Sequence, residues 1–153
     1  MKLSTNMKEE KQREQSLVVK LSGLMFLVGF VLAGLSYRFG WLMLPRWVNI
    51  VGAVLFLMSY ALYAEVLREN IWLSRTIEVQ EGQQVVSDGL YGVIRHPMYA
   101  VTVTLFLSMP LVLGSALAFA VFLAYPFIIS KRIRNEEEVL ARDLPGYPEY
   151  MQQ

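Results

Sequence analysis

The sequence of 153 residues contains no cysteine and a single histidine, His96. Without cysteine there is no disulfide framework, no thiolate nucleophile and no cysteine-ligated metal. A lone histidine also lacks the ligand set of a zinc site, so we expect no bound metal. The sequence has neither a glycine-rich phosphate loop nor a nucleophile elbow, which excludes the commonest phosphate-binding and serine-hydrolase motifs.

Charge is scarce as well. Charged residues make up 18% of the sequence and hydrophobic residues 55%, and the apolar residues fall in long blocks. Residues 17–36 contain one charge, Lys20, and residues 47–64 contain none. At about 1.5 Å per residue, each block is long enough to cross the hydrocarbon core of a bilayer as a helix. We therefore predict a polar tail over residues 1–16, followed within 17–64 by two transmembrane helices that act as scaffold.

A third apolar block covers residues 98–130. As one straight helix it would measure about 50 Å, which exceeds the thickness of the bilayer core. Pro110 and Gly114 lie where a turn would divide it into arms of about 12 and about 16 residues. The sequence thus predicts an all-α integral membrane protein with about four transmembrane helices, the last two forming a helical hairpin.

The basic residues indicate the orientation. Twelve of the 14 lysine and arginine residues fall within residues 1–20, 65–97 and 131–153, and the other two, Arg38 and Arg46, lie between the first two spans. By the positive-inside rule, both termini and the long polar loop face the cytoplasm. Topology explains the basic residues, so we expect no nucleic-acid partner. The first block lacks a small-residue cleavage pattern, and we expect a membrane anchor rather than a cleaved signal peptide, in the cytoplasmic membrane if the cell is bacterial.

Two polar stretches, residues 65–99 and 131–150, flank the predicted hairpin and would meet at its cytoplasmic base. Pro97 suits the first position of a helix, whose free N–H groups favour an anionic ligand group. His96 beside it can be a base, a ligand or a structural cap. We therefore place a cofactor pocket here and treat residues 65–153 as the catalytic region.

Arg132 and Glu136 are four residues apart and share one helix face. Considered alone, they are typical of a solvated helix end. They become more specific together with two motifs, GLYGVIRHPMY ending at Tyr99 and RNEEEVLARDLPGYPEY ending at Tyr150, which stand on either side of the apolar hairpin.

This combination, over about residues 70–150, resembles the isoprenylcysteine carboxyl methyltransferase family and its short bacterial and archaeal relatives. The family pattern has a G-x-Y turn, an Arg-His-Pro-x-Tyr helix start, a membrane hairpin, paired glutamates followed by leucine, and a final tyrosine motif. The sequence departs from it in two places. Val101 replaces a glycine that is often present, and the basic, proline-containing segment that often follows the last tyrosines is absent before Gln153.

The resemblance implies methyl transfer from S-adenosylmethionine at the cytoplasmic membrane surface. It implies that Arg132 meets the methyl acceptor and that Arg132 and Glu136 are the catalytic residues. The cofactor-binding residues that it implies are Gln83, Gln84, Val85, Val86, Tyr91, His96, Pro97, Met98, Tyr99 and Glu136.

Such chemistry fits the absence of a catalytic triad. Transfer from a sulfonium to a carboxylate is an in-line displacement, and the carboxylate is already ionised at neutral pH. The enzyme must supply alignment and a dry site rather than a general base. Arg132 can hold the acceptor carboxylate, Glu136 can accept from ribose hydroxyls or the amine, and Tyr91 or Tyr99 can pack on the adenine.

We expect a lipidic or amphiphilic small-molecule substrate, with membrane lipid as the surroundings. Three alternatives stay open. The chain could be an NADPH-dependent membrane reductase of the sterol reductase type, which shares a similar Arg-His-Pro-x-Tyr element. It could methylate a phospholipid amine, or it could be a small, non-enzymatic membrane subunit.

Overall fold

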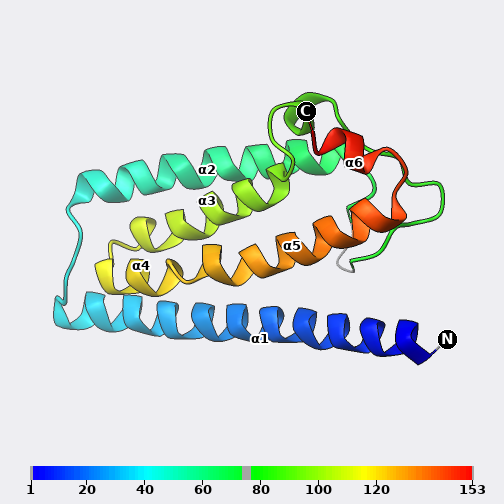
Figure 1. Ribbon diagram of the computed structural model, residues 1–153. Coiled ribbons are helices and arrows are strands. Elements are labelled where there is room, and N and C mark those ends of the chain that lie inside the picture. The colour runs from blue at the N-terminus through cyan, green and yellow to red at the C-terminus, as the bar shows by residue number, and fades with distance from the viewer. Residues whose placement is uncertain (1, 74–76, 153) are drawn as a thin grey trace.

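The computed structural model describes residues 2–73 and 77–152, and within these residues the chain forms helices and turns but no β-strand. The long helices lie alongside one another, with α3 packed on α2 and with α4 and α5 packed on α1 (Figure 1). The elements in chain order are α1 (Lys2–Phe39), α2 (Arg46–Glu69), the short 3-10 helix η1 (Gly89–Gly92), α3 (Pro97–Val112), α4 (Ala116–Phe122), α5 (Tyr125–Asp143) and α6 (Tyr147–Tyr150).

Three helical segments are long and apolar enough to cross a membrane: Gln15–Phe39, Arg46–Glu69 and Ala116–Asp143. The sequence predicts about four such spans. The remaining apolar helix, α3, has 16 residues, which gives about 24 Å at 1.5 Å per residue, less than the roughly 30 Å of the hydrocarbon core. The described residues therefore contain three candidate spans and one shorter apolar helix beside them.

The third apolar block breaks at one of the two residues named for the turn and not at the other. Pro110 lies inside α3 and does not form the turn, which falls at Gly114 with φ +71°. A positive φ is readily adopted by glycine and strained for other residues, which explains the position of the break. Ser115 then caps α4, because its side-chain oxygen accepts from the backbone N–H of Ala118. The returning arm is also longer than expected and breaks once more before α5, which begins at Tyr125 and has Pro126 in its first turn.

The end of the molecule that carries this turn is tied to the connection between α1 and α2. The backbone N–H of Leu44 donates to the carbonyl of Gly114 over 2.8 Å. The hydroxyl of Ser115 donates to that of Ser36 over 2.9 Å, and both side chains are fully buried. Buried polar groups satisfied in this way fix the helix ends relative to each other.

Close packing of α1 against α4 depends on small residues. A side chain at Gly29 would overlap the ring of Phe122, and Ala33, four residues further on, is buried. The rings of Phe26 and Phe106 complete an aromatic core, with centroid distances of 4.8 Å to each other and 5.2 Å from Phe26 to Phe122. The small-residue spacing therefore serves packing within the chain.

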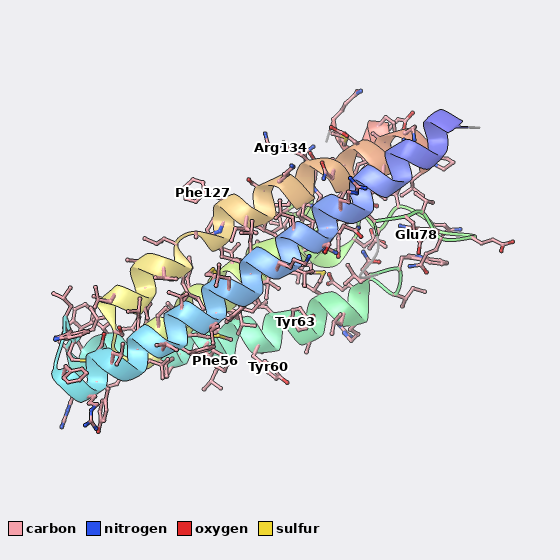
Figure 2. All side chains as sticks on the ribbon, turned by 90° about the horizontal axis from the view of Figure 1, so that it is seen from below. Phe56, Tyr60, Tyr63, Glu78, Phe127 and Arg134 are labelled. Atoms are coloured by element: carbon pink, nitrogen blue, oxygen red, sulfur yellow. The ribbon has the colours of Figure 1, made fainter. Side chains whose placement is uncertain are left out.

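The outer faces of the helices are strongly apolar. Figure 2 shows Phe127 on α5 and Tyr60 on α2 pointing away from the bundle, and they are 80% and 63% exposed. Monomeric soluble proteins rarely expose continuous apolar faces of this kind. Together with the candidate spans, these faces indicate an integral membrane protein, whose helices satisfy their backbone groups internally.

Candidate active site

Residues after the C-terminal end of α2, at the start of α3, on the polar part of α5 and in α6 line a cavity. Figure 1 shows that these segments lie together at the end of the bundle opposite the turn between α3 and α4. The empty volume of the cavity is about 870 Å³, a figure that includes solvent-open space at its mouth. The predicted site residues that line it are Gln83, Gln84, Val85, Val86, Tyr91, His96, Met98, Tyr99, Arg132 and Glu136.

Pro97 is the one predicted site residue outside this lining. It is fully buried at the first position of α3, where its missing N–H costs no helical hydrogen bond. His96 is the residue before the helix and makes no side-chain cap. Its ring is therefore available for other contacts within the cavity.

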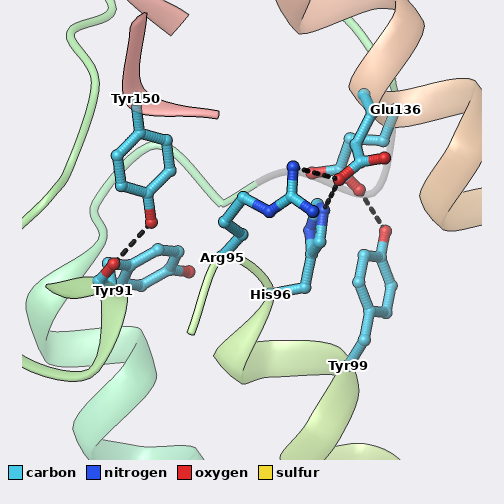
Figure 3. A network of polar contacts seen from close by, with 7 residues as sticks. Tyr91, Arg95, His96, Tyr99, Glu136 and Tyr150 are labelled. Carbon is cyan, nitrogen blue, oxygen red and sulfur yellow. Dashed lines mark hydrogen bonds and ion pairs between the residues drawn. The ribbon is translucent and has the colours of Figure 1, made fainter. Parts of the chain in front are cut away.

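His96 contacts an acidic residue of α5. Its Nε2 lies 2.8 Å from Oε1 of Glu137, and the guanidinium of Arg95 lies 3.5 Å from the same oxygen (Figure 3). The contact joins residues 41 positions apart in the chain. The Arg-His-Pro helix start and the paired glutamates are thus held together by a direct polar interaction between α3 and α5.

A second network involves Tyr99, whose hydroxyl donates to Oε2 of Glu136 (Figure 3). The same hydroxyl accepts from Nε of Arg132 over 3.1 Å. Arg132 and Glu136 lie one helical turn apart on α5 and both line the cavity. A fixed cation and a carboxylate acceptor are therefore presented on one wall, oriented by a shared phenol.

The turn that carries Tyr91 is built on glycine. Gly89 has φ +59°, and a side chain there would collide with the carboxylate of Glu69. That carboxylate instead accepts from the backbone N–H of Leu90 over 2.9 Å. The hydroxyl of Tyr150 donates to the carbonyl of Tyr91 over 2.5 Å, which attaches α6 to this turn.

The loop after α2 contributes the wall that includes Gln83 and Gln84. The backbone N–H of Gln80 donates to Oε1 of Gln83 over 2.8 Å, and the side-chain amide of Gln80 donates to the carbonyl of Trp72 over 2.9 Å. The side-chain oxygen of Gln83 is thus already used in shaping the loop. Residues 74–76 of the same loop lie outside the described residues.

The cavity has two chemically different ends. The charged and hydroxyl groups of Arg132, Glu136 and Tyr99 form one end. A buried apolar cluster of Leu144, Tyr147 and Tyr150, with Val85 and Leu140 packed against it, forms the other. All five residues of this cluster line the cavity.

Tyr147 stands out within the apolar end. Burial, followed by the negative charges of Glu137 and Glu136, raises the pKa of Tyr147 to about 12. Burial likewise raises the pKa of Tyr91 above its ordinary value. Both phenols therefore stay protonated at neutral pH and remain hydrogen-bond donors.

Sequence reasoning named Glu137, Tyr147 and Tyr150 within its motifs without giving them a role. Leu140 has a sequence signal, because it follows Arg132 and Glu136 at four-residue spacing on the same helix face. The loop residues Trp72, Leu73 and Ile77, which also line the cavity, carry no comparable signal. Their position depends on how the loop folds back over the helices.

Comparison with known families gives a match over most of the helical bundle. The model of the family described as Isoprenylcysteine carboxyl methyltransferase (ICMT) family matches residues 47–142, which is more than half of the chain. The match extends from α2 through nearly all of α5 and leaves out α1 and α6. No curated protein matches the chain.

Proposed function

The chain belongs to the isoprenylcysteine carboxyl methyltransferase family, and from this premise we propose that it transfers the methyl group of S-adenosylmethionine to a carboxylate on a lipidic or amphiphilic acceptor. Membership itself makes it a membrane methyltransferase. The methyl donor, the acceptor class and the site residues are the proposal. The observation that carries it is the shared cavity of Arg132, Glu136 and the start of α3.

The residues around the cavity fit this donor. S-adenosylmethionine combines a carboxylate, an amine, ribose hydroxyls and a heteroaromatic base. Glu136 offers a carboxylate to hydroxyl and amine donors, the N-terminus of α3 favours an anionic group, and the apolar tyrosine cluster suits a planar ring. The cavity thus holds a matching group for each chemical part, together with the walls formed by residues 83–86 and Met98.

When bound, S-adenosylmethionine supplies a methyl group activated by the sulfonium. The chain must then hold the acceptor in line and keep water out. Arg132 carries a permanent, fork-shaped positive charge that can hold a carboxylate, and its orientation is set by the bond to Tyr99. No side chain needs to remove a proton, because a carboxylic acid with a pKa near 4 is ionised at neutral pH.

We further propose that α3 and the α4–α5 arm form a membrane hairpin whose base, with the cavity, faces the cytoplasm. Its support is the charge distribution: the basic residues concentrate at the cavity end of the bundle, and Arg38 and Arg46 lie at the other end. An acceptor with a lipid tail would then approach the cavity from the inner leaflet.

Calorimetry of the purified protein with S-adenosylhomocysteine, the product form of the donor, is the direct test. We expect saturable binding at micromolar concentrations. Absence of heat at high micromolar ligand contradicts the proposal. Comparison of membranes with and without the protein by mass spectrometry, in search of a methylated product, then identifies the acceptor and separates carboxylates from phospholipid amines.

The family match does not favour the reductase hypothesis or the subunit hypothesis. A thermal-shift assay separates all three. Stabilisation by S-adenosylhomocysteine supports the methyltransferase, stabilisation by NADPH alone supports a reductase, and no stabilisation by either is the result that a non-enzymatic subunit gives.

A further inference from the structure

Among the residues that the structure describes, one buried side-chain polar atom has no hydrogen-bond partner, the hydroxyl of Tyr147. The residue is 4% exposed and lines the cavity. A buried hydroxyl without a hydrogen-bond partner destabilises the folded state, and such a group in a native protein calls for an explanation. A neighbouring residue offers a useful contrast, because the hydroxyl of Tyr150 is bonded to the carbonyl of Tyr91.

The surroundings of Tyr147 point to the kind of ligand group that it would meet. Its ring lies 5.8 Å from that of Tyr150, and Leu144, Leu140 and Val85 complete an apolar wall. A ribose or an amino acid group needs several polar partners, and the carboxylate of Glu136 and the hydroxyl bonded to it offer these. An apolar, aromatic wall with one hydrogen-bond donor suits a planar heteroaromatic ring.

We infer that Tyr147 is the base-recognition residue of the cavity, donating a hydrogen bond from its hydroxyl to a ring nitrogen of an adenine held at the apolar end. The inference rests on the proposed use of an S-adenosyl donor and adds a residue outside the segment matched by the family. The sequence analysis expected Tyr91 or Tyr99 to pack on the adenine, whereas this inference places the adenine against the tyrosine pair at α6. The hydroxyl of Tyr99 is bonded to Glu136 and Arg132.

The electrostatics of the site agree with this role. Glu136 and Glu137 both act on Tyr147 as negative charges, and its phenol remains neutral at neutral pH. A neutral phenol keeps its proton for donation, and an aromatic ring nitrogen is an uncharged acceptor. The pairing therefore adds no unpaired charge to a buried, apolar wall.

The test uses two matched variants, Tyr147→Phe and Tyr150→Phe, and four ligands: S-adenosylhomocysteine and its 1-deaza, 3-deaza and 7-deaza analogues. We expect wild-type protein to bind one of the three analogues about 5- to 10-fold more weakly than the parent, the size of one hydrogen bond. In Tyr147→Phe that ratio falls to about 1, while Tyr150→Phe retains it. Combining the protein variant with the ligand analogue makes a thermodynamic cycle, which isolates the bond between the phenol and the ring nitrogen.

Thermal unfolding without ligand gives an independent readout. Because the hydroxyl of Tyr147 is unsatisfied, Tyr147→Phe should leave the melting temperature unchanged or raise it. Tyr150→Phe should lower it, since a bond is lost. Equal destabilisation by both substitutions would show that a structural water satisfies Tyr147 and would overturn the inference.

Failure of the Tyr147 inference can be distinguished from failure of the proposed function. If wild-type protein does not bind S-adenosylhomocysteine, both the proposed function and this inference are wrong. If wild-type protein binds the parent and all three analogues equally, only the inference is wrong, and this measurement needs no variant to fold. Equal affinity of Tyr147→Phe and wild-type protein for the parent ligand contradicts the inference in the same way.

Discussion

Single hydroxyls organise the charged end of the cavity. The phenol of Tyr99 accepts from Arg132 and donates to Glu136, so the cation and the carboxylate are oriented before any ligand arrives. Orientation in advance reduces the conformational entropy lost on binding. The same residues that the family resemblance implies as ligand contacts are thus already partners of each other.

The proposal gives Glu136 a role in binding the donor and Arg132 a role in holding the acceptor, and this difference leads to a first prediction. Glu136→Gln should weaken binding of S-adenosylhomocysteine at least about tenfold, because a hydrogen bond to a charged group contributes about 1.5–3 kcal/mol. Arg132→Ala should keep the affinity within about twofold and reduce turnover at least about 100-fold, because its proposed contact is the acceptor. Calorimetry and a methyl-transfer assay measure the two effects.

The controls lie on the same helix. Glu138 and Arg134 are exposed on α5 and do not line the cavity. Glu138→Gln and Arg134→Ala should leave both affinity and turnover unchanged. Equal losses of binding and turnover in Glu136→Gln and Arg132→Ala would show that the roles are assigned incorrectly.

The second prediction concerns Tyr147 and the loss of protein stability at alkaline pH. The folded pKa of Tyr147, about 12, lies above the ordinary value of 10.0. Its contribution to stability is therefore complete below pH 10 and is lost as the pH rises from 10 to 12, by at most about 3 kcal/mol. The stability of Tyr147→Phe should fall less over this range, as measured by denaturant unfolding, and parallel curves would contradict the assigned shift.

At the level of secondary-structure elements, two glycine turns stand at opposite ends of the bundle. Gly114 follows α3 at the end of the bundle opposite the cavity, called here the closed end. A side chain at Gly114 would meet the amide of Asn49 at 2.8 Å. Gly89 opens η1 at the cavity end, against the carboxylate of Glu69. Both have positive φ, so each allows a reversal that other residues adopt only with strain.

The two glycine turns lead to a third prediction. Gly89→Ala and Gly114→Ala should each lower stability by about 1–3 kcal/mol, because both combine a positive φ with a close contact. Only Gly89→Ala should also weaken binding of S-adenosylhomocysteine, by about fivefold or more, since η1 places Tyr91 in the cavity wall. Thermal unfolding and calorimetry on the same preparations measure both quantities.

Gly34→Ala is the control, because this glycine lies within α1 and a side chain there would meet nothing within 4 Å. Alanine favours the helix, so this variant should be as stable as wild-type protein or slightly more stable. Unchanged affinity in Gly89→Ala would show that the G-x-Y turn does not shape the ligand site.

At the scale of the whole molecule, the bundle has one polar end with a cavity and one closed end with an aromatic rim. Tyr37, Trp41 and Trp47 are exposed at the closed end. Tyrosine and tryptophan commonly lie at the membrane interface. The two ends therefore suit the two aqueous faces of a membrane.

The orientation is a fourth prediction, and the absence of cysteine makes it simple to measure. A cysteine introduced by Tyr37→Cys should react with a membrane-impermeant maleimide in intact cells. One introduced by Glu149→Cys, in the exposed part of α6, should react only after the membrane is permeabilised. The reverse pattern would place the cavity outside the cytoplasm and contradict the proposed topology.

The sequence by itself determined the all-helical membrane character and the positions of the first two spans, because long apolar blocks with at most one charge are compatible with few structures other than spanning helices. It also identified the helix start at Pro97 and the family, since these depend on local residue types in a fixed order. The residues implied for the site were named from that order alone.

Only the tertiary structure decided which of those residues face each other. The contact of His96 with Glu137 and the unsatisfied hydroxyl of Tyr147 both depend on how distant segments pack together. Local sequence patterns fix periodicity and chain reversals, whereas the direction of a side chain into a shared cavity depends on how the helices pack and how the connecting loop folds over them.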